Sequence, residues 1–202
     1  MQLTPSIFAG MMDRILHQIS GIVTLNETER AAFVAITSFK SLRKHELLLR
    51  AGDVCRAITF VHSGCLRLFY NIEGVENTVQ FFCENAWHTD YGSFLTARPS
   101  SENTQALEAC EVVQFHRTDL EQLYLQHPVF ERLGRISAEN AFMSLGARNA
   151  MLTNQTPEER YQQLAHDRPE LLQRVPQYHI ASFLGIKPET LSRIRKRMVS
   201  RV

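Results

Sequence analysis

The chain changes its hydrophobic period twice, which divides it into helical and extended regions. The runs "SIFAGMMDRILHQIS" and "TLNETERAAFVAI" place apolar residues three and four positions apart, as an amphipathic helix does. Thr24 and Glu27 have the spacing of a capping box that would open the second helix. From Ser38 to Arg117 the apolar runs become short and rich in β-branched and aromatic residues, and turn residues such as Gly52 separate them. We therefore expect two helices followed by an antiparallel sandwich or jelly roll.

The helical period returns after Arg117 and continues for the rest of the chain. Thr118 and Glu121 form a second possible capping box, and the short helix that they would open ends near His127-Pro128. In the next box, Thr156 is followed by Pro157 and Glu159, which predicts a new helix and a boundary near 153–156.

Between these boxes, a long helix over about 129–152 carries apolar residues at alternating steps of four and three, which is a heptad seam. The seam consists of Val129, Leu133, Ile136, Asn140, Met143, Ala147 and Ala150. A second apolar flank consists of Phe130, Ala138, Ala141, Leu145 and Leu152. We interpret the seam as a contact between two copies of the helix, with Asn140 fixing the register. The alternative is that one chain buries both flanks.

The stretch "HIASFLGIKPETLSRIRKRM", residues 179–198, has the pattern of a helix-turn-helix. In its first half Ala181 is small where two helices must approach, and Gly185 lies where the turn needs a left-handed residue. In its second half Leu191, Ile194 and Met198 share one face. The opposite face and its flanks carry the polar candidates for DNA contact, which are Lys187, Glu189, Thr190, Ser192, Arg193, Lys196, Arg197 and Ser200.

Charge supports this interpretation of the terminal motif. The whole chain has a net charge of +1, but residues 187–202 hold six bases and one acid, which is a net +5. A cationic helix with donors and acceptors on one face suits phosphates and base edges. The alternative, a solvated basic tail, does not account for Ala181 and Gly185 at their positions. We therefore predict double-stranded DNA as a partner.

Together these motifs make the chain resemble a Crp/Fnr-family transcription regulator over nearly its whole length. The segment "AGDVCRAITFVHSGCLRLFY" resembles the family's "PGD … G-x-v-r" β-roll motif. The resemblance implies an α+β fold with three parts: a cyclic-nucleotide-binding-like β-roll over 1–128, a dimerisation helix over 129–153, and a winged-helix-like helix-turn-helix domain over 154–202. It also implies a homodimer on a palindromic site. Glu189, Thr190 and Arg193 match the family's recognition helix, whereas Pro188 replaces its leading Arg.

The β-roll departs from the cAMP-binding members of this family. Those members end their phosphate-binding segment with Arg-Ser, where this sequence aligns Asn103 and Thr104. Asn103 cannot supply the positive charge that a cyclic phosphate needs, so cAMP is not expected as the effector. Candidate residues for another effector are Phe94, Arg98, Asn103 and Thr104, and the alternative is that they only pack the roll.

Other classes of function fit the sequence less well. The four cysteines, which are Cys55, Cys65, Cys83 and Cys110, include no C-x-x-C pair and no N-terminal cluster. We expect buried thiols, with neither a zinc finger nor an iron–sulfur centre. A jelly-roll enzyme of the cupin type would need a clustered His-x-His, whereas the histidines are scattered, and we predict no catalytic residues, metal or cofactor.

A second hypothesis, from a different class, is a small-molecule sensor module in which DNA contact is secondary.

No signal peptide or long apolar segment is evident, so we expect a cytoplasmic protein. Further expected partners are RNA polymerase and an unknown small-molecule effector.

Overall fold

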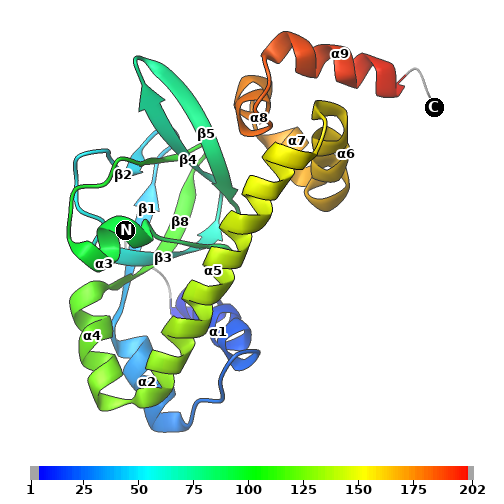
Figure 1. Ribbon diagram of the computed structural model, residues 1–202. Helices are drawn as coiled ribbons and strands as arrows, with labels where there is room; N and C mark the ends of the chain where they lie inside the picture. The colour runs from blue at the N-terminus through cyan, green and yellow to red at the C-terminus, as the bar shows by residue number, and fades with distance from the viewer. Residues whose placement is uncertain (1–4, 200–202) are drawn as a thin grey trace. The chain divides into compact units, whose positions relative to one another are not determined.

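The computed structural model describes residues 5–199 and divides into two compact units (Figure 1). Within the described residues, the first unit holds 5–67 and 81–140, and the second holds 68–80 and 141–199. The predicted α+β class is confirmed, because a roll of antiparallel strands is followed by one long helix and further helices. The division passes through the long helix and assigns one hairpin of the roll to the C-terminal unit.

The helices of the first unit are α1 (Pro5–Ser20), α2 (Glu27–Ala35), α3 (Tyr91–Thr96) and α4 (Arg117–Gln126). Two predicted capping boxes are wrong. The box of α2 is formed by Asn26 and Glu29, where Glu29 N donates to Asn26 Oδ1 at 2.9 Å and Asn26 N donates to Glu29 Oε2 at 2.8 Å. Sequence spacing could not separate this box from the neighbouring pair at Thr24, since both offer the same chemistry.

The second wrong box lies at α4, which begins at Arg117, two residues earlier than a cap at Thr118 allows. Its N-cap residue, His116, makes no side-chain capping hydrogen bond. Glu121 pairs instead with Arg117, one turn earlier on the same helix, at 2.6 Å. A helical i,i+4 ion pair has therefore replaced the expected cap.

The roll consists of two four-stranded sheets. Its strands are β1 (Thr37–Leu42), β2 (Leu47–Leu49), β3 (Ala57–Ser63), β4 (Leu66–Ile72), β5 (Val75–Phe82), β6 (Trp87–His88), β7 (Asn103–Ala106) and β8 (Cys110–His116). One sheet has the order β1-β8-β3-β6, and the other has β2-β7-β4-β5. Antiparallel pairing sets Thr37 and Ile58 on either side of Phe115.

The core lies on both faces of the β8 strand, because successive side chains of a strand point to opposite sides. Cys110 and Val112 belong to an apolar cluster with residues of β1, β3 and β4. Phe115 points the other way, toward the helices. The ring of Phe33 in α2 stacks on Phe115 at 4.7 Å and on Phe130 at 5.5 Å between centroids. The start of the long helix is thus fixed to the roll by aromatic packing.

The C-terminal helices are α5 (Pro128–Asn154), α6 (Pro157–Asp167), α7 (Pro169–Arg174), α8 (Gln177–Phe183) and α9 (Pro188–Val199). The capping box at α6 is confirmed: Glu159 N donates to Thr156 Oγ1 at 3.3 Å, and Thr156 N donates to Glu159 Oε2 at 2.8 Å. Residues 155–199 contain no β-strand, so the wing implied by the resemblance is absent from that part of the chain. Ser200 lies outside the described residues.

Candidate nucleic-acid interface

The turn between α8 and α9 is a Schellman motif built on Gly185. This glycine has a φ of +66°, the left-handed conformation that an L side chain disfavours. Gly185 N donates to Ser182 O at 3.0 Å, and Ile186 N donates to Ala181 O at 3.0 Å. These two bonds satisfy carbonyls at the end of α8 and turn the chain sharply. The left-handed turn residue predicted from the sequence is confirmed.

The next helix starts on Lys187, whose carbonyl accepts the N–H groups of Thr190 at 3.0 Å and Leu191 at 3.1 Å. Pro188 occupies the first helical position, where its missing N–H costs nothing. Leu191 and Ile194 are each 1% exposed, and their helix contacts α8, in whose region Ile180, Ala181 and Leu184 are also buried. One face of α9 is therefore fixed to α8, and the opposite face is left for solvent or a ligand.

The predicted DNA-contacting residues of α9 lie on that opposite face and its flanks, and Lys187 directly precedes the helix. Six of them, Lys187, Glu189, Ser192, Arg193, Lys196 and Arg197, are exposed, and Thr190 is half-buried. Arg193 Nη2 donates to Thr190 Oγ1 at 3.3 Å, which orients its guanidinium along the helix. Arg197 Nη2 lies 3.5 Å from Glu158 Oε2 at the start of α6. An exposed ion pair of this kind contributes little to stability, so a phosphate can compete for Arg197.

One exposed cation of α9 was missed by the sequence analysis. Arg195 is exposed, although helical projection places it close to the buried Leu191. A long side chain can leave an apolar face and reach solvent at its tip. The net charge of the segment was the only signal for it, because periodicity alone assigns this position to the edge of the buried face.

Two arginines, the half-buried Arg148 and the buried Arg160, fasten α8 and α6 to the end of α5. Arg148 Nη2 donates to Phe183 O at 3.1 Å, and its guanidinium lies 4.4 Å from the centre of the Phe183 ring. Arg160 Nη1 donates to Leu152 O at 3.0 Å. Each cation thus meets carbonyls at a helix C-terminus, where the helix dipole is negative. Burial, with a further contribution from the Arg160 charge, lowers the pKa of Arg148 to about 10.

The long helix leaves apolar side chains exposed along two stripes. On the predicted seam, Val129 and Leu133 pack against the core of their own chain, whereas Met143 is 71% exposed. On the second flank, Leu145 is 62% exposed. At about 100° per residue, Met143 and Leu145 point to nearly opposite sides. Phe142, 76% exposed, lies with the second flank by the same geometry.

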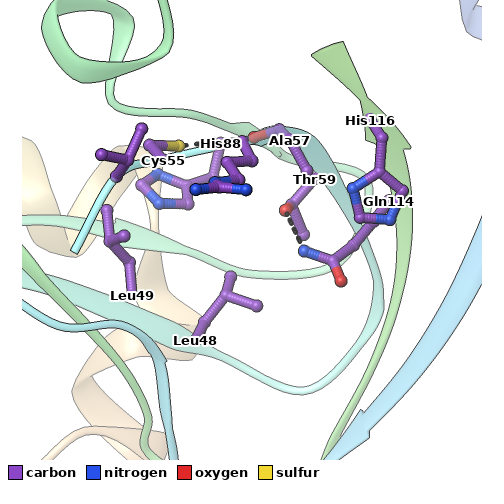
Figure 2. Close-up of a pocket in the computed structure, with 10 residues that line it drawn as sticks. Leu48, Leu49, Cys55, Ala57, Thr59, His88, Gln114 and His116 are labelled. Atoms are coloured by element: carbon purple, nitrogen blue, oxygen red, sulfur yellow. Dashed lines mark hydrogen bonds between the residues drawn. The ribbon is translucent and has the colours of Figure 1, made fainter. Parts of the chain in front are cut away.

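The roll has a partly open cavity of about 170 Å³ between strands β2, β3, β6 and β8 (Figure 2). Its lining consists of Leu48, Leu49, Val54, Cys55, Arg56, Ala57, Thr59, His88, Gln114 and His116. His88 is buried and its Nε2 lies 2.9 Å from Thr104 Oγ1. Burial lowers the pKa of His88 to about 4, against an opposing contribution from Asp90. This imidazole is therefore neutral at physiological pH.

None of the predicted effector residues lines this cavity. Phe94 belongs to the core of the first unit, and Thr104 is fully buried beside His88. Asn103 Oδ1 accepts from Ala51 N at 3.0 Å, so this amide caps the loop before β3. Arg98 is exposed, and its carbonyl accepts from Ser93 Oγ at 2.6 Å. The structure therefore does not bring the four side chains together around one hollow.

A buried cation inside the roll was also missed by the sequence analysis. Arg67 of β4 is 1% exposed and donates from Nη2 to Gln105 Oε1 of β7 at 3.0 Å.

The described residues contain no group of three or more His, Cys, Asp or Glu side chains placed to hold a metal ion. Among the same residues, no helix is both long and apolar enough to cross a bilayer.

Comparison with known proteins agrees with this architecture. Residues 39–127 match the family model of the cyclic nucleotide-binding domain. The structure of FixK2 from Bradyrhizobium japonicum matches with a TM-score of 0.69 at 17% identity, covering 82% of this chain and 86% of that one. CLP, a c-di-GMP-responsive global regulator of Xanthomonas campestris, matches with a TM-score of 0.67 at 16% identity, over 87% of this chain and 93% of that one.

A third match is the Catabolite Activator Protein of Thermus thermophilus, with a TM-score of 0.52 at 20% identity over 88% of this chain and 85% of that one. A comparison with curated proteins finds no match. These results define the class of fold as a β-roll like that of cyclic nucleotide-binding domains, followed by a long helix and further helices. The resemblance to Crp/Fnr regulators is thus confirmed at the level of the fold.

Proposed function

We propose that the chain is a DNA-binding transcription regulator of the Crp/Fnr type, acting as a cytoplasmic homodimer on a palindromic site and having no enzymatic activity. The observation that carries this proposal is the two-sided α9, since Leu191 and Ile194 are buried while polar and charged side chains occupy the opposite face and its flanks. A helix held in this way presents its outer face to the major groove.

Each side chain on this face has a role that its chemistry supports. Arg193 can donate two hydrogen bonds to a guanine edge, and Glu189 can accept from a cytosine amino group. Thr190 and Ser192 can meet either bases or phosphates. Lys187, Lys196 and Arg197 supply the phosphate contacts that fix position and add affinity without sequence preference. Pro188, in place of the Arg found in cAMP-binding members, favours a different half-site.

A homodimer would place two copies of α9 in successive turns of the major groove, about 34 Å apart. The seam proposed for this contact consists of Val129, Leu133, Ile136, Asn140, Met143 and Ala147. Support comes from Met143, which is exposed in the single chain although it lies in an apolar stripe. Burying such a stripe between two helices is the usual reason for its presence.

The effector proposal excludes cAMP and leaves the ligand open. A cyclic phosphate needs a cation, yet Asn103 stands where the cAMP-binding members have Arg. Its Oδ1 already accepts a hydrogen bond from Ala51 N. The candidate effector residues Phe94, Arg98, Asn103 and Thr104 rest on the resemblance alone, as does RNA polymerase as a partner. A second candidate function, a small-molecule sensor with secondary DNA contact, is favoured by the cavity of about 170 Å³ in the roll.

Selection of duplexes from a random library by the full chain, followed by titration of a labelled selected duplex, tests the main proposal. We expect palindromic sites whose half-site centres lie one helical turn apart. Arg193→Ala should cost about 1–3 kcal/mol on the selected site and relax the preference at one base pair. Arg195→Ala, with the same charge change on another side of α9, is the matched control and should keep the base preference. If Arg193→Ala and Lys196→Ala bound as tightly and selectively as wild type, this face would not be the reading surface.

A further inference from the structure

Two buried thiols face one another at the base of the β4–β5 hairpin. Cys65 immediately precedes β4 and Cys83 immediately follows β5, with exposures of 1% and 6%. Cys83 Sγ donates a hydrogen bond to Cys65 Sγ across 3.1 Å between the sulfurs. A disulfide bond is about 2.05 Å long, so closing this gap needs a movement of about 1 Å. The fold has thus brought together two sulfurs that are 18 positions apart in sequence.

The other two cysteines point at oxygen atoms. Cys55 Sγ lies 3.5 Å from both Ala57 O and Thr89 Oγ1. Cys110 Sγ donates to Glu108 O at 3.4 Å and to Cys65 O at 3.6 Å, and burial raises its pKa to about 11. Both therefore serve as internal controls that share the burial of the pair and differ in their contacts.

The loop before Cys65 is shaped for this close approach. Gly64 has a φ of +94°, and a Cβ at this position would lie 2.5 Å from Cys110 Sγ. Gly64 N donates to Glu84 Oε1 at 2.8 Å, and Glu84 is the neighbour of Cys83 in sequence. The loop that carries one sulfur is therefore tied directly to the segment that carries the other.

We propose that Cys65 and Cys83 are an oxidation site, a dithiol that a hydroperoxide converts into an intramolecular disulfide. Cys65 Sγ accepts the hydrogen bond from Cys83, so we assign Cys65 as the attacking sulfur, in the thiolate form that is nucleophilic. This thiolate attacks one peroxide oxygen, the O–O bond breaks, and the other oxygen leaves as water or an alcohol. The resulting sulfenic acid at Cys65 is then attacked by Cys83. The S–S bond forms, the S–O bond breaks, and the oxygen leaves with the Cys83 proton as water.

The disulfide would close a covalent ring around the β4–β5 hairpin. Residues 68–80 of this hairpin belong to the unit that contains α8 and α9, and Thr78 N of β5 donates to Ser182 Oγ of α8 at 2.8 Å. Oxidation therefore acts on a strand pair that contacts the helix-turn-helix. The chemistry of the thiol pair does not depend on DNA binding, so this inference stands apart from the proposed function.

The test treats the reduced, folded full chain with hydrogen peroxide, then blocks the remaining thiols with iodoacetamide in denaturant. Two of the four thiols should no longer react with iodoacetamide, and the intact mass should show no added oxygen. Treatment with dithiothreitol should make both thiols reactive again. Trypsin alone leaves Cys83 and Cys110 in one peptide, because Arg98 precedes a proline. Digestion with trypsin and a glutamyl endopeptidase separates them, and the peptide of Cys65 should be linked to the peptide of Cys83.

Four single variants complete the experiment. Cys55→Ser and Cys110→Ser should still lose two thiols, whereas Cys65→Ser and Cys83→Ser should lose none to a disulfide within the chain. Several results would overturn the proposal: a link to Cys55 or Cys110, a bond between two chains, oxygen addition alone, or thiol loss only after denaturation. Peptide mapping of the wild type decides the matter even if a Ser variant does not fold.

Discussion

The main-chain N–H of Thr78 donates to Ser182 Oγ at 2.8 Å, which joins the β5 strand to the first helix of the helix-turn-helix. The same hydroxyl donates to Glu76 O at 3.3 Å. β5 lies at the edge of its sheet, where main-chain groups lack a neighbouring strand. The hydroxyl of Ser182 thus satisfies two main-chain groups of β5, the N–H of Thr78 and the carbonyl of Glu76, that a neighbouring strand would otherwise bind.

This contact makes Ser182 a determinant of stability. Ser182→Ala should leave the main-chain N–H of Thr78 without its acceptor. Because Thr78 is only 3% exposed, water cannot readily replace the hydroxyl, and the loss should cost about 1–3 kcal/mol. The free energy of unfolding in urea measures the loss. Ser144→Ala, at an exposed position of α5, is the control and should change that free energy by less than about 0.5 kcal/mol. Equal effects from the two substitutions would show that the hydroxyl contact contributes nothing.

The two apolar stripes of α5 can be told apart by a pair of charge substitutions. Met143→Asp should disrupt the proposed dimer because it places a carboxylate in the seam, and light scattering should then report the 23.2 kDa chain. Leu145→Asp carries the same change onto the opposite side of the helix and should leave the dimer intact. The reverse pattern would move the dimer contact to the second flank, and a 23.2 kDa species for the wild type at micromolar concentration would exclude the dimer.

Gly185 and Gly146 should respond in opposite directions to alanine. Gly185→Ala puts a side chain into a residue with a φ of +66° and should cost about 1–2 kcal/mol, although its new Cβ meets only Leu152 Cδ2 at 3.5 Å. Gly146→Ala lies inside α5 with no atom within 4 Å of the new Cβ, and it should stabilise the chain by up to about 1 kcal/mol. Thermal unfolding of both variants checks the pair. A stabilising Gly185→Ala would mean that the turn does not need the left-handed conformation.

Acid should destabilise the fold through His88. Its pKa is about 4 in the folded state against 6.5 for an ordinary histidine, so between these values the unfolded chain binds more protons. The free energy of unfolding therefore falls as the pH drops from about 6.5 to about 4, by roughly 3 kcal/mol for this group. Burial also lowers the pKa of His62, which adds a slope of the same sign.

The contribution of His88 is isolated by comparing wild type with His88→Gln in urea across this pH range. The variant keeps a polar side chain near Thr104 but cannot titrate, so its free energy of unfolding should change less with pH. Parallel curves for the two proteins would show that His88 is not buried in its neutral form.

Sequence reasoning succeeded where the deciding contacts are local. The box of Thr156 and Glu159 spans three residues, and the turn at Gly185 is closed by bonds within five residues. It failed at Thr24 and Thr118 for a related reason. Several nearby residues offer the same capping chemistry, and the helix register, which depends on packing, selects among them.

The sequence by itself determined the α+β class, the long helix and the two faces of α9, because hydrophobic period and helix geometry act within a few residues. Only the tertiary structure decided that Cys65 meets Cys83 and that Thr78 meets Ser182, across 18 and 104 positions. It also decided that Asn103 caps the loop at Ala51 and that Arg148 lies over Phe183. Such contacts depend on how whole strands and helices pack against one another, and no local pattern of side chains encodes that packing.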